Sequence, residues 1–135
     1  MNENIVLELK EEHKKIISFF NEIDATDILA EKKNFIKDLK KMLSEHLRKE
    51  DAIVYPVLLR SDDKEVLALG RGFLNSMVGY SKIFSDVVGR IMESSNHLYL
   101  ETVKDYENIR DRIKDRMFVE EVALFPAYKR EQSRE

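Results

Sequence analysis

Apolar residues recur along most of the chain at intervals of three and four, which is the spacing of one face of an α-helix. The pattern divides into four segments separated by polar, turn-forming clusters, and they cover approximately residues 5–20, 28–56, 66–91 and 103–124. Because the connections are short, neighbouring helices should run antiparallel. The sequence therefore predicts an all-α protein, an up-down-up-down antiparallel four-helix bundle. A three-helix bundle is the alternative if the chain breaks near Gly79.

The composition fits one globular helical domain. The chain has 135 residues, of which 43% are hydrophobic and 36% charged, so we expect a single domain over residues 1–135 with a polar, fraying tail from about Lys129. The net charge of −3 and the absence of a dense basic patch argue against a nucleic-acid partner.

Cysteine is absent, which excludes disulfides, thiolate metal sites and cysteine nucleophiles. The acidic N-terminus lacks the apolar run of a signal peptide, and no stretch approaches the roughly 18 apolar residues of a membrane span. The expected location is therefore cytoplasmic. The sequence carries no signal for an oligomeric state.

Two stretches of the chain repeat one pattern. Residues 46–56 read HLRKEDAIVYP, and residues 116–126 read RMFVEEVALFP. In both, a glutamate (Glu50 and Glu120) stands six residues before a proline and is followed by a second acidic residue. The first position differs, because it is histidine in one stretch and arginine in the other.

A second repeat lies upstream of each of these stretches. The sequence HKKII from His13 matches YSKIF from Tyr80, so the first two helices are echoed by the last two. A bundle with this two-fold pseudo-symmetry would bring His13, His46, Tyr80 and Arg116 toward one level of its core.

Five polar residues fall on the inward, apolar stripes, and they are His13, His46, Glu50, Arg116 and Glu120. Carboxylates and imidazoles that converge in a bundle core must be paired, protonated or bound to metal. Two histidines with two carboxylates suffice for one divalent iron, manganese or zinc ion. Two purely structural interpretations compete with metal binding. A histidine in the core can be hydrogen-bonded to the backbone, and Glu120 can form an ion pair with Arg116. A register error of one residue would instead place Met117 inside and Arg116 outside.

Three stretches carry a resemblance to a known family: EHKKI at 12–16, HLRKEDAIVYP at 46–56 and EEVALFP at 120–126. Together and in this order they resemble the hemerythrin-like, HHE cation-binding family, over nearly the whole chain. The resemblance implies a four-helix bundle that holds two non-haem irons, which are bridged by two carboxylates and capped by histidines.

Carried over residue by residue, the resemblance implies an asymmetric centre. His13 and His46 match histidine ligands, and Glu50 and Glu120 match the bridging carboxylates. The remaining histidine positions of the family are occupied by other residues, namely Ser76, Tyr80 and Arg116. One iron would keep its protein ligands and the other would lose every imidazole. Tyr80 would then fill space, hydrogen-bond a carboxylate or ligate ferric iron.

Two functional hypotheses follow. The first is a metal-binding domain with a reduced, mononuclear site for iron, whose role is sensing or storage of iron or a response to dioxygen or nitric oxide. Reversible dioxygen binding in the family draws one electron from each of two irons, so the altered site puts that activity in doubt. The second is a metal-free regulatory or interaction bundle, in which Arg116 pairs with Glu50 and Glu120.

An enzyme is the least favoured reading, because the chain has no recognisable nucleophile motif or glycine-rich phosphate loop. Asp51 and Glu121, which follow the two motif glutamates, are expected in solvent or around the site, and His97 is expected on the surface.

Overall fold

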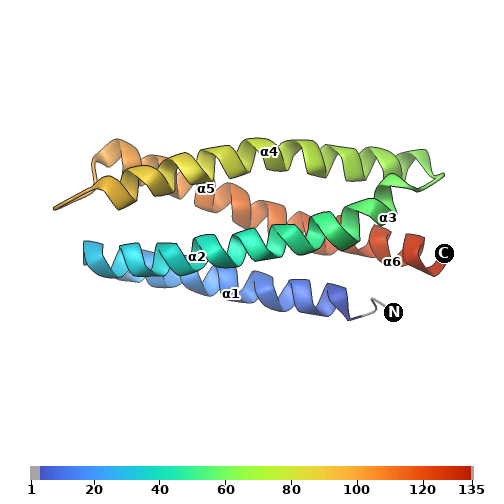
Figure 1. Ribbon diagram of the computed structural model, residues 1–135, viewed down its shortest axis with the longest axis horizontal. Coiled ribbons are helices and arrows are strands. Elements are labelled where there is room, and N and C mark those ends of the chain that lie inside the picture. Colours follow the sequence, from blue (N-terminus) through green and yellow to red (C-terminus); the bar gives the residue numbers. More distant parts are fainter. Residues whose placement is uncertain (1–3, 135) are drawn as a thin grey trace.

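The computed structural model describes residues 4–134, and over these residues it consists of four antiparallel helical rods without strands (Figure 1). The rods are α1 (Ile5–Ala25); α2 (Leu29–Lys49) with η1 (Glu50–Val54) and α3 (Tyr55–Leu59); α4 (Lys64–Glu93); and α5 (Leu100–Val119) with η2 (Glu120–Leu124) and α6 (Phe125–Arg134). The predicted four-helix bundle is confirmed. The three-helix alternative is wrong, since α4 continues without interruption through Gly79.

The side chains in the turns cap some helices and not others. The side chain of Asp63 caps α4 by accepting hydrogen bonds from the amides of Glu65 and Val66, at 2.9 and 3.4 Å. The hydroxyl of Thr26 instead accepts a hydrogen bond from the amide of Ile28 within the turn, at 3.2 Å. The N-cap of α2 is Ile28, which makes no side-chain hydrogen bond.

None of the helices within residues 4–134 has the length and apolar content that crossing a membrane requires.

The two prolines produce a π-helical turn rather than a helix end. A proline lacks an N–H group, and its ring clashes with the carbonyl four residues earlier in an α-helix. Just before Pro56, the amide of Tyr55 bonds to the carbonyl of Glu50, five residues back. Phe125 and Glu120 repeat this bond before Pro126. The wider turn accommodates each proline and lets the rod continue.

A polar layer divides the core into two apolar clusters. One cluster includes Ile16 and Phe20 and lies toward the connection between α1 and α2; the other includes Leu9 and lies toward the chain termini. His13 stands between Leu9 and Ile16 on α1 and is 1% exposed. The layer contains the five predicted inward polar residues, namely His13, His46, Glu50, Arg116 and Glu120, all of which are buried.

The C-terminal segment, for which we expect a polar tail from about Lys129, is helical over the described residues. α6 runs to Arg134, and the side chain of Glu131 within it is buried, with 6% of its surface exposed. Its carboxylate also pairs with Arg134 at 3.0 Å, one helical turn later.

Candidate metal centre

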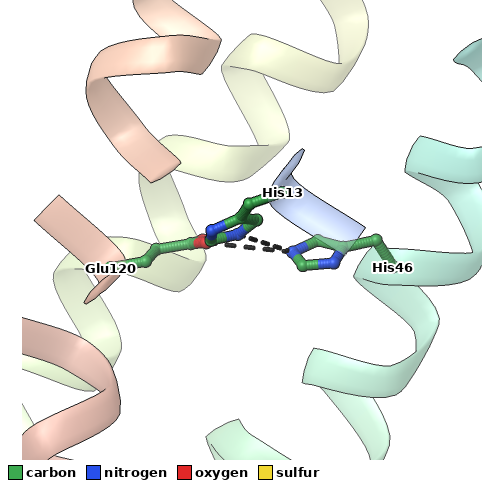
Figure 2. Close-up of side chains that lie close together, drawn as sticks. All are labelled: His13, His46 and Glu120. Atoms are coloured by element: carbon green, nitrogen blue, oxygen red, sulfur yellow. Dashed lines mark hydrogen bonds and ion pairs between the residues drawn. The ribbon is translucent and has the colours of Figure 1, made fainter. Parts of the chain in front are cut away.

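Three side-chain atoms suitable as metal ligands converge in the polar layer (Figure 2). Nε2 of His13 on α1 lies 3.1 Å from Nε2 of His46 on α2. Oε1 of Glu120, at the start of η2, lies 2.9 Å from the first of these nitrogens and 3.8 Å from the second. All three residues are at most 2% exposed. Three of the four rods thus aim one ligand atom each at a common point.

These separations fit a single divalent cation. Metal–ligand bonds of about 2.1 Å place neighbouring ligand atoms of an octahedron or a tetrahedron about 3.0 to 3.4 Å apart. The observed separations of 2.9, 3.1 and 3.8 Å bracket this range. Small side-chain adjustments would therefore bring all three atoms into bonding distance of one ion.

Glu50 is a fourth candidate ligand, and it is fully buried. Its Oε1 lies 3.1 Å from Nε2 of His46, one helical turn earlier, but the contact lacks hydrogen-bond geometry. Among the residues that the structure describes, neither carboxylate oxygen has a hydrogen-bond partner. Burial is the main reason why the pKa of Glu50 rises to about 7. A buried carboxylate without hydrogen bonds is costly, and a bound cation would remove that cost.

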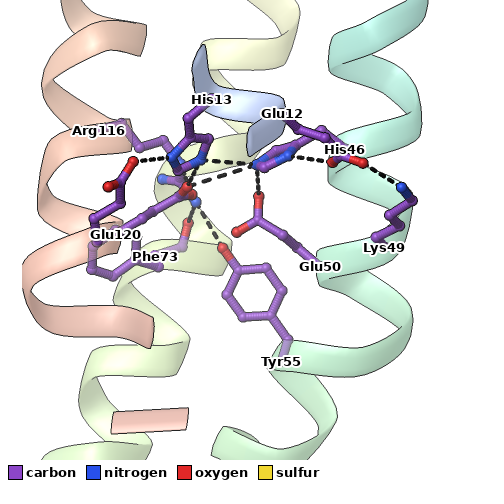
Figure 3. Close-up of polar contacts among 10 residues, drawn as sticks. Glu12, His13, His46, Lys49, Glu50, Tyr55, Phe73, Arg116 and Glu120 are labelled. Atoms are coloured by element: carbon purple, nitrogen blue, oxygen red, sulfur yellow. Dashed lines mark hydrogen bonds and ion pairs between the residues drawn. The ribbon is translucent and has the colours of Figure 1, made fainter. Parts of the chain in front are cut away.

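The outer nitrogen of each imidazole is held by a further carboxylate (Figure 3). Nδ1 of His13 lies 2.7 Å from Oε2 of Glu121, and Nδ1 of His46 lies 2.9 Å from Oε1 of Glu12. The ammonium of Lys49 contacts the other oxygen of Glu12. With their outer nitrogens in these contacts, the two rings have their Nε2 atoms facing the centre.

The acidic surroundings favour positive charge on His46. Burial alone would lower the pKa of this imidazole, but its contacts with Glu120 and Glu50 outweigh burial and raise the pKa to about 10. Burial alone would likewise raise the pKa of Glu120, and hydrogen bonding with His13 and His46 lowers it instead. The centre is therefore built to hold positive charge, whether from a proton or from a metal ion.

Arg116 supplies a second, permanent positive charge on the far side of Glu120. Its Nε lies 3.3 Å from Oε2 of Glu120, while Oε1 of the same carboxylate faces the imidazoles. Glu120 thus bridges the candidate cation position and a guanidinium. The expected Arg116–Glu120 pair is confirmed, whereas the structure shows no Arg116–Glu50 contact within residues 4–134.

The guanidinium is anchored on its other edges by α3 and α4. Nη1 donates to Oγ of Ser76 at 2.8 Å; Nη2 donates to the hydroxyl of Tyr55 at 2.7 Å and to the carbonyl of Phe73 at 2.9 Å. The rings of Phe73 and Tyr80 lie 5.0 and 5.9 Å from its central carbon. Arg116 is therefore a fixed part of the layer, and it lies inside the bundle rather than outside it.

A cleft of about 470 Å³ opens between α4 and α5 and reaches Arg116. Its lining includes Gly72, Phe73, Ser76, Tyr80 and Val119. A Cβ atom built at Gly72 would meet nothing within 4 Å, so the cleft is not crowded at this residue. The cleft lies on the Arg116 side of the polar layer.

Periodicity found the inward residues but missed their supports. Glu12, Lys49, Tyr55 and Phe73 were not singled out as parts of the site, and Glu121 was expected in solvent or around the site. Glu12 has a usable signal, because it directly precedes His13. The roles of Tyr55 and Phe73 depend on how α3 and α4 pack, which no local pattern reveals.

Comparison with known proteins agrees with this geometry. The family model described as the hemerythrin HHE cation binding domain matches residues 4–128. No curated protein and no solved structure matches the chain significantly. The family match spans the four rods and both π turns, including the buried His13, His46 and Glu120 cluster. The chain therefore belongs to the hemerythrin HHE cation-binding domain family.

Proposed function

We propose that this domain binds one divalent metal ion, with iron favoured, through His13, His46, Glu50 and Glu120. The observation that carries the proposal is the convergence of three ligand atoms beside a fully buried carboxylate without hydrogen bonds. Two imidazoles and two carboxylates form a donor set that suits iron, manganese or zinc, and membership of the family favours iron. A bound iron would supply one-electron redox chemistry and an attachment point for a small molecule.

Arg116 limits the centre to one ion. The position on the far side of Glu120 faces a guanidinium, which is always charged and cannot act as a metal ligand. Apart from Glu120, the side chains that contact it are those of Tyr55, Phe73, Ser76 and Tyr80, and none of these is an imidazole or a carboxylate. Arg116 therefore provides on this side the positive charge that a second metal would provide.

A one-ion centre suits sensing or storage better than oxygen carriage. Reversible dioxygen binding in the family uses two irons, whereas holding iron, or reporting on dioxygen or nitric oxide through a single iron, needs only one. The cleft between α4 and α5 supports access of such small molecules to the Arg116 side of the centre. Iron as the resident ion and a sensing role are our proposals for this chain.

The decisive experiment measures metal content. Protein stripped with a chelator is reloaded with ferrous iron without air, desalted and assayed by mass spectrometry, in parallel with Arg116→His. We expect about one iron per chain, rising toward two in the variant, because the substitution supplies an imidazole in place of the guanidinium. If neither protein retains metal and chelator leaves the thermal melt unchanged, metal binding is refuted.

That negative result would favour a metal-free interaction bundle. The observation on its side is that Glu120 already contacts His13, His46 and Arg116 directly, so much of the buried charge can be balanced without an ion. In that case the polar layer would serve the specificity of packing, as buried polar groups do in some other bundles.

A further inference from the structure

His13 is bracketed by two consecutive carboxylates. Oε1 of Glu120 lies 2.9 Å from its Nε2, and Oε2 of Glu121 lies 2.7 Å from its Nδ1. The second contact ties α1 to η2 across 108 residues of sequence. Glu121 is 37% exposed, whereas Glu120 is buried. Glu120 therefore faces the candidate metal position, and Glu121 contacts the opposite side of the imidazole ring.

The π turn explains how neighbouring residues reach the same imidazole. In an α-helix, consecutive side chains point about 100° apart, which separates adjacent residues onto different faces. A π turn accommodates more residues in each turn, so the angle between neighbours is smaller. η2 begins at Glu120, and both carboxylates at its start are therefore directed toward α1.

We propose that Glu121 is a positioning residue for the metal ligand His13. By accepting the Nδ1–H hydrogen bond, its carboxylate selects the tautomer in which Nε2 keeps a lone pair, and it aims that lone pair at the ion. The negative charge of Glu121 also makes the imidazole more basic and therefore a stronger metal ligand. This inference rests on the proposed metal binding and assigns a role to a residue outside the ligand set.

The pseudo-symmetry of the chain provides a matched control. Asp51 follows Glu50 at the start of η1, as Glu121 follows Glu120 at the start of η2. Asp51 is exposed, and the carboxylate that accepts from Nδ1 of His46 is Glu12 instead. Of these two equivalent acidic residues, only Glu121 contacts a histidine ring. Substitution of Glu121, and not of Asp51, should therefore affect metal binding. Glu12 is a less suitable test because it also pairs with Lys49.

The test compares Glu121→Ala, Glu121→Gln and Asp51→Ala in the full chain. The probe is Co²⁺, whose visible absorption reports its coordination, and affinity is measured by competition with a chelator. We expect Glu121→Ala to bind Co²⁺ about 10- to 100-fold more weakly, the usual cost of losing a group that orients a ligand. Glu121→Gln keeps an acceptor oxygen and should lose less, and Asp51→Ala should match the unaltered protein.

A second readout separates positioning from a merely structural tie between α1 and η2. In Zn²⁺-loaded protein, the nitrogen chemical shifts of the His13 ring should show protonated Nδ1, and Glu121→Ala should change them. Glu121→Ala also removes the tie between α1 and η2, so the metal-free protein should lose some stability, but less free energy than its loss of Co²⁺ affinity corresponds to. A loss of affinity matched by an equal loss of metal-free stability would overturn the positioning role.

Two other results would also overturn it, and they differ in what they mean. Equal Co²⁺ affinity in Glu121→Ala, Asp51→Ala and the unaltered protein would remove the role of Glu121 and leave the metal site standing. Absence of Co²⁺ binding in the unaltered protein, together with absence of iron binding, would instead refute the proposed function itself.

Discussion

The two halves of the chain share a backbone but not a chemistry. Residues 5–59 and residues 64–134 each form a long helix, a second long helix, a five-residue π turn that begins at a glutamate, and an α-helix that contains a proline. The first half places His13, His46 and Glu50 in the polar layer. The second half contributes a guanidinium and a glutamate to that layer.

This difference shows that the residues that determine the bundle are not the residues that determine the chemistry of its polar layer. The π turns follow from the prolines and the rods follow from the apolar stripes, so neither depends on histidine ligands. The number of cations that the centre holds depends instead on a few side chains. The first half offers imidazoles, which accept a proton or a metal, whereas the second half offers a guanidinium, which is always charged in proteins.

Glu120 is where the halves meet. Its Oε1 faces the two imidazoles, and its Oε2 faces Arg116. Each half thus supplies positive charge to one carboxylate, from an exchangeable source on one side and a fixed source on the other. The predictions below remove or titrate one side at a time.

The largest expected effect on stability is that of Arg116→Ala in the metal-free protein. The substitution leaves the carboxylate of Glu120 without its fixed counter-charge and the hydroxyl of Tyr55 without the hydrogen bond that it accepts, and breaking a buried ion pair costs about 3–5 kcal/mol. Urea denaturation measures the loss. Arg112→Ala is the control, because Arg112 lines the same cleft but is exposed; it should change stability by less than about 0.5 kcal/mol. Equal effects of the two substitutions would show that the fixed charge is dispensable.

The next largest effect is expected from removing a histidine of the first half. His46→Gln should weaken metal binding by more than about 100-fold, because loss of a ligand costs more than loss of a group that only orients one. Competition with a chelator measures the affinity, and circular dichroism verifies the fold. His97→Gln, at an exposed position outside the layer, should bind as the unaltered protein does. A His46 variant that binds metal normally would contradict its assignment as a ligand.

The sequence predicted the architecture because helical periodicity, proline and short connections are local signals. It also identified the inward polar residues, since each falls on an apolar stripe; the ligand role of these residues stays a prediction. The supports were missed for a physical reason. Tyr55 and Phe73 contact Arg116 from α3 and α4, so their roles depend on tertiary packing. The helical C-terminus was missed because Glu131 reads as polar, although it is buried.

The pairing of Glu121 with His13 shows the same limit from another side. In a regular α-helix, the neighbour of an inward residue points away from the core, and on that basis Glu121 is expected in solvent or around the site rather than against a ligand. The π turn changes the angle between neighbours, and the sequence signal for it is the proline six residues after the glutamate. Asp51 has the same local signal but stays exposed, so the outcome depends on what packs opposite each turn.

The halves should also differ in their response to pH. The pKa of His46 is raised from 6.5 to about 10 in the metal-free fold. The stability that its protonated form contributes is therefore fully present below about pH 6.5 and is lost as the pH rises through about 10. Between pH 7 and 9 the free energy of unfolding should fall by up to about 2.7 kcal/mol, since one proton is worth about 1.4 kcal/mol per pH unit.

Thermal melts of metal-free protein across this range test the prediction. His46→Gln should lack the decline, and metal-loaded protein should lack it too, because metal binding requires the unprotonated imidazole. A decline of equal size in His46→Gln would assign the titration to another group.

The smallest effect concerns one hydroxyl at equivalent positions of the two halves. Tyr55 and Phe125 each precede a proline; the hydroxyl of the first accepts from Arg116, whereas the second stacks on His13 with ring centroids 5.6 Å apart. Tyr55→Phe makes the two positions identical and removes one hydrogen bond to a charged group. The remaining contacts of the guanidinium limit the loss to about 1.5 kcal/mol, at the low end for such bonds.

Urea denaturation of metal-free protein measures this loss, and Tyr99→Phe, at an exposed position, is the control that should show none. Burial raises the pKa of Tyr55, so its hydroxyl stays protonated and the result should not depend on pH near neutrality. If Tyr55→Phe is as stable as the control, the hydroxyl of Ser76, the carbonyl of Phe73 and the carboxylate of Glu120 suffice to anchor Arg116. The fixed charge of the second half would then be held by residues of that half alone, without help from the half that carries the histidines.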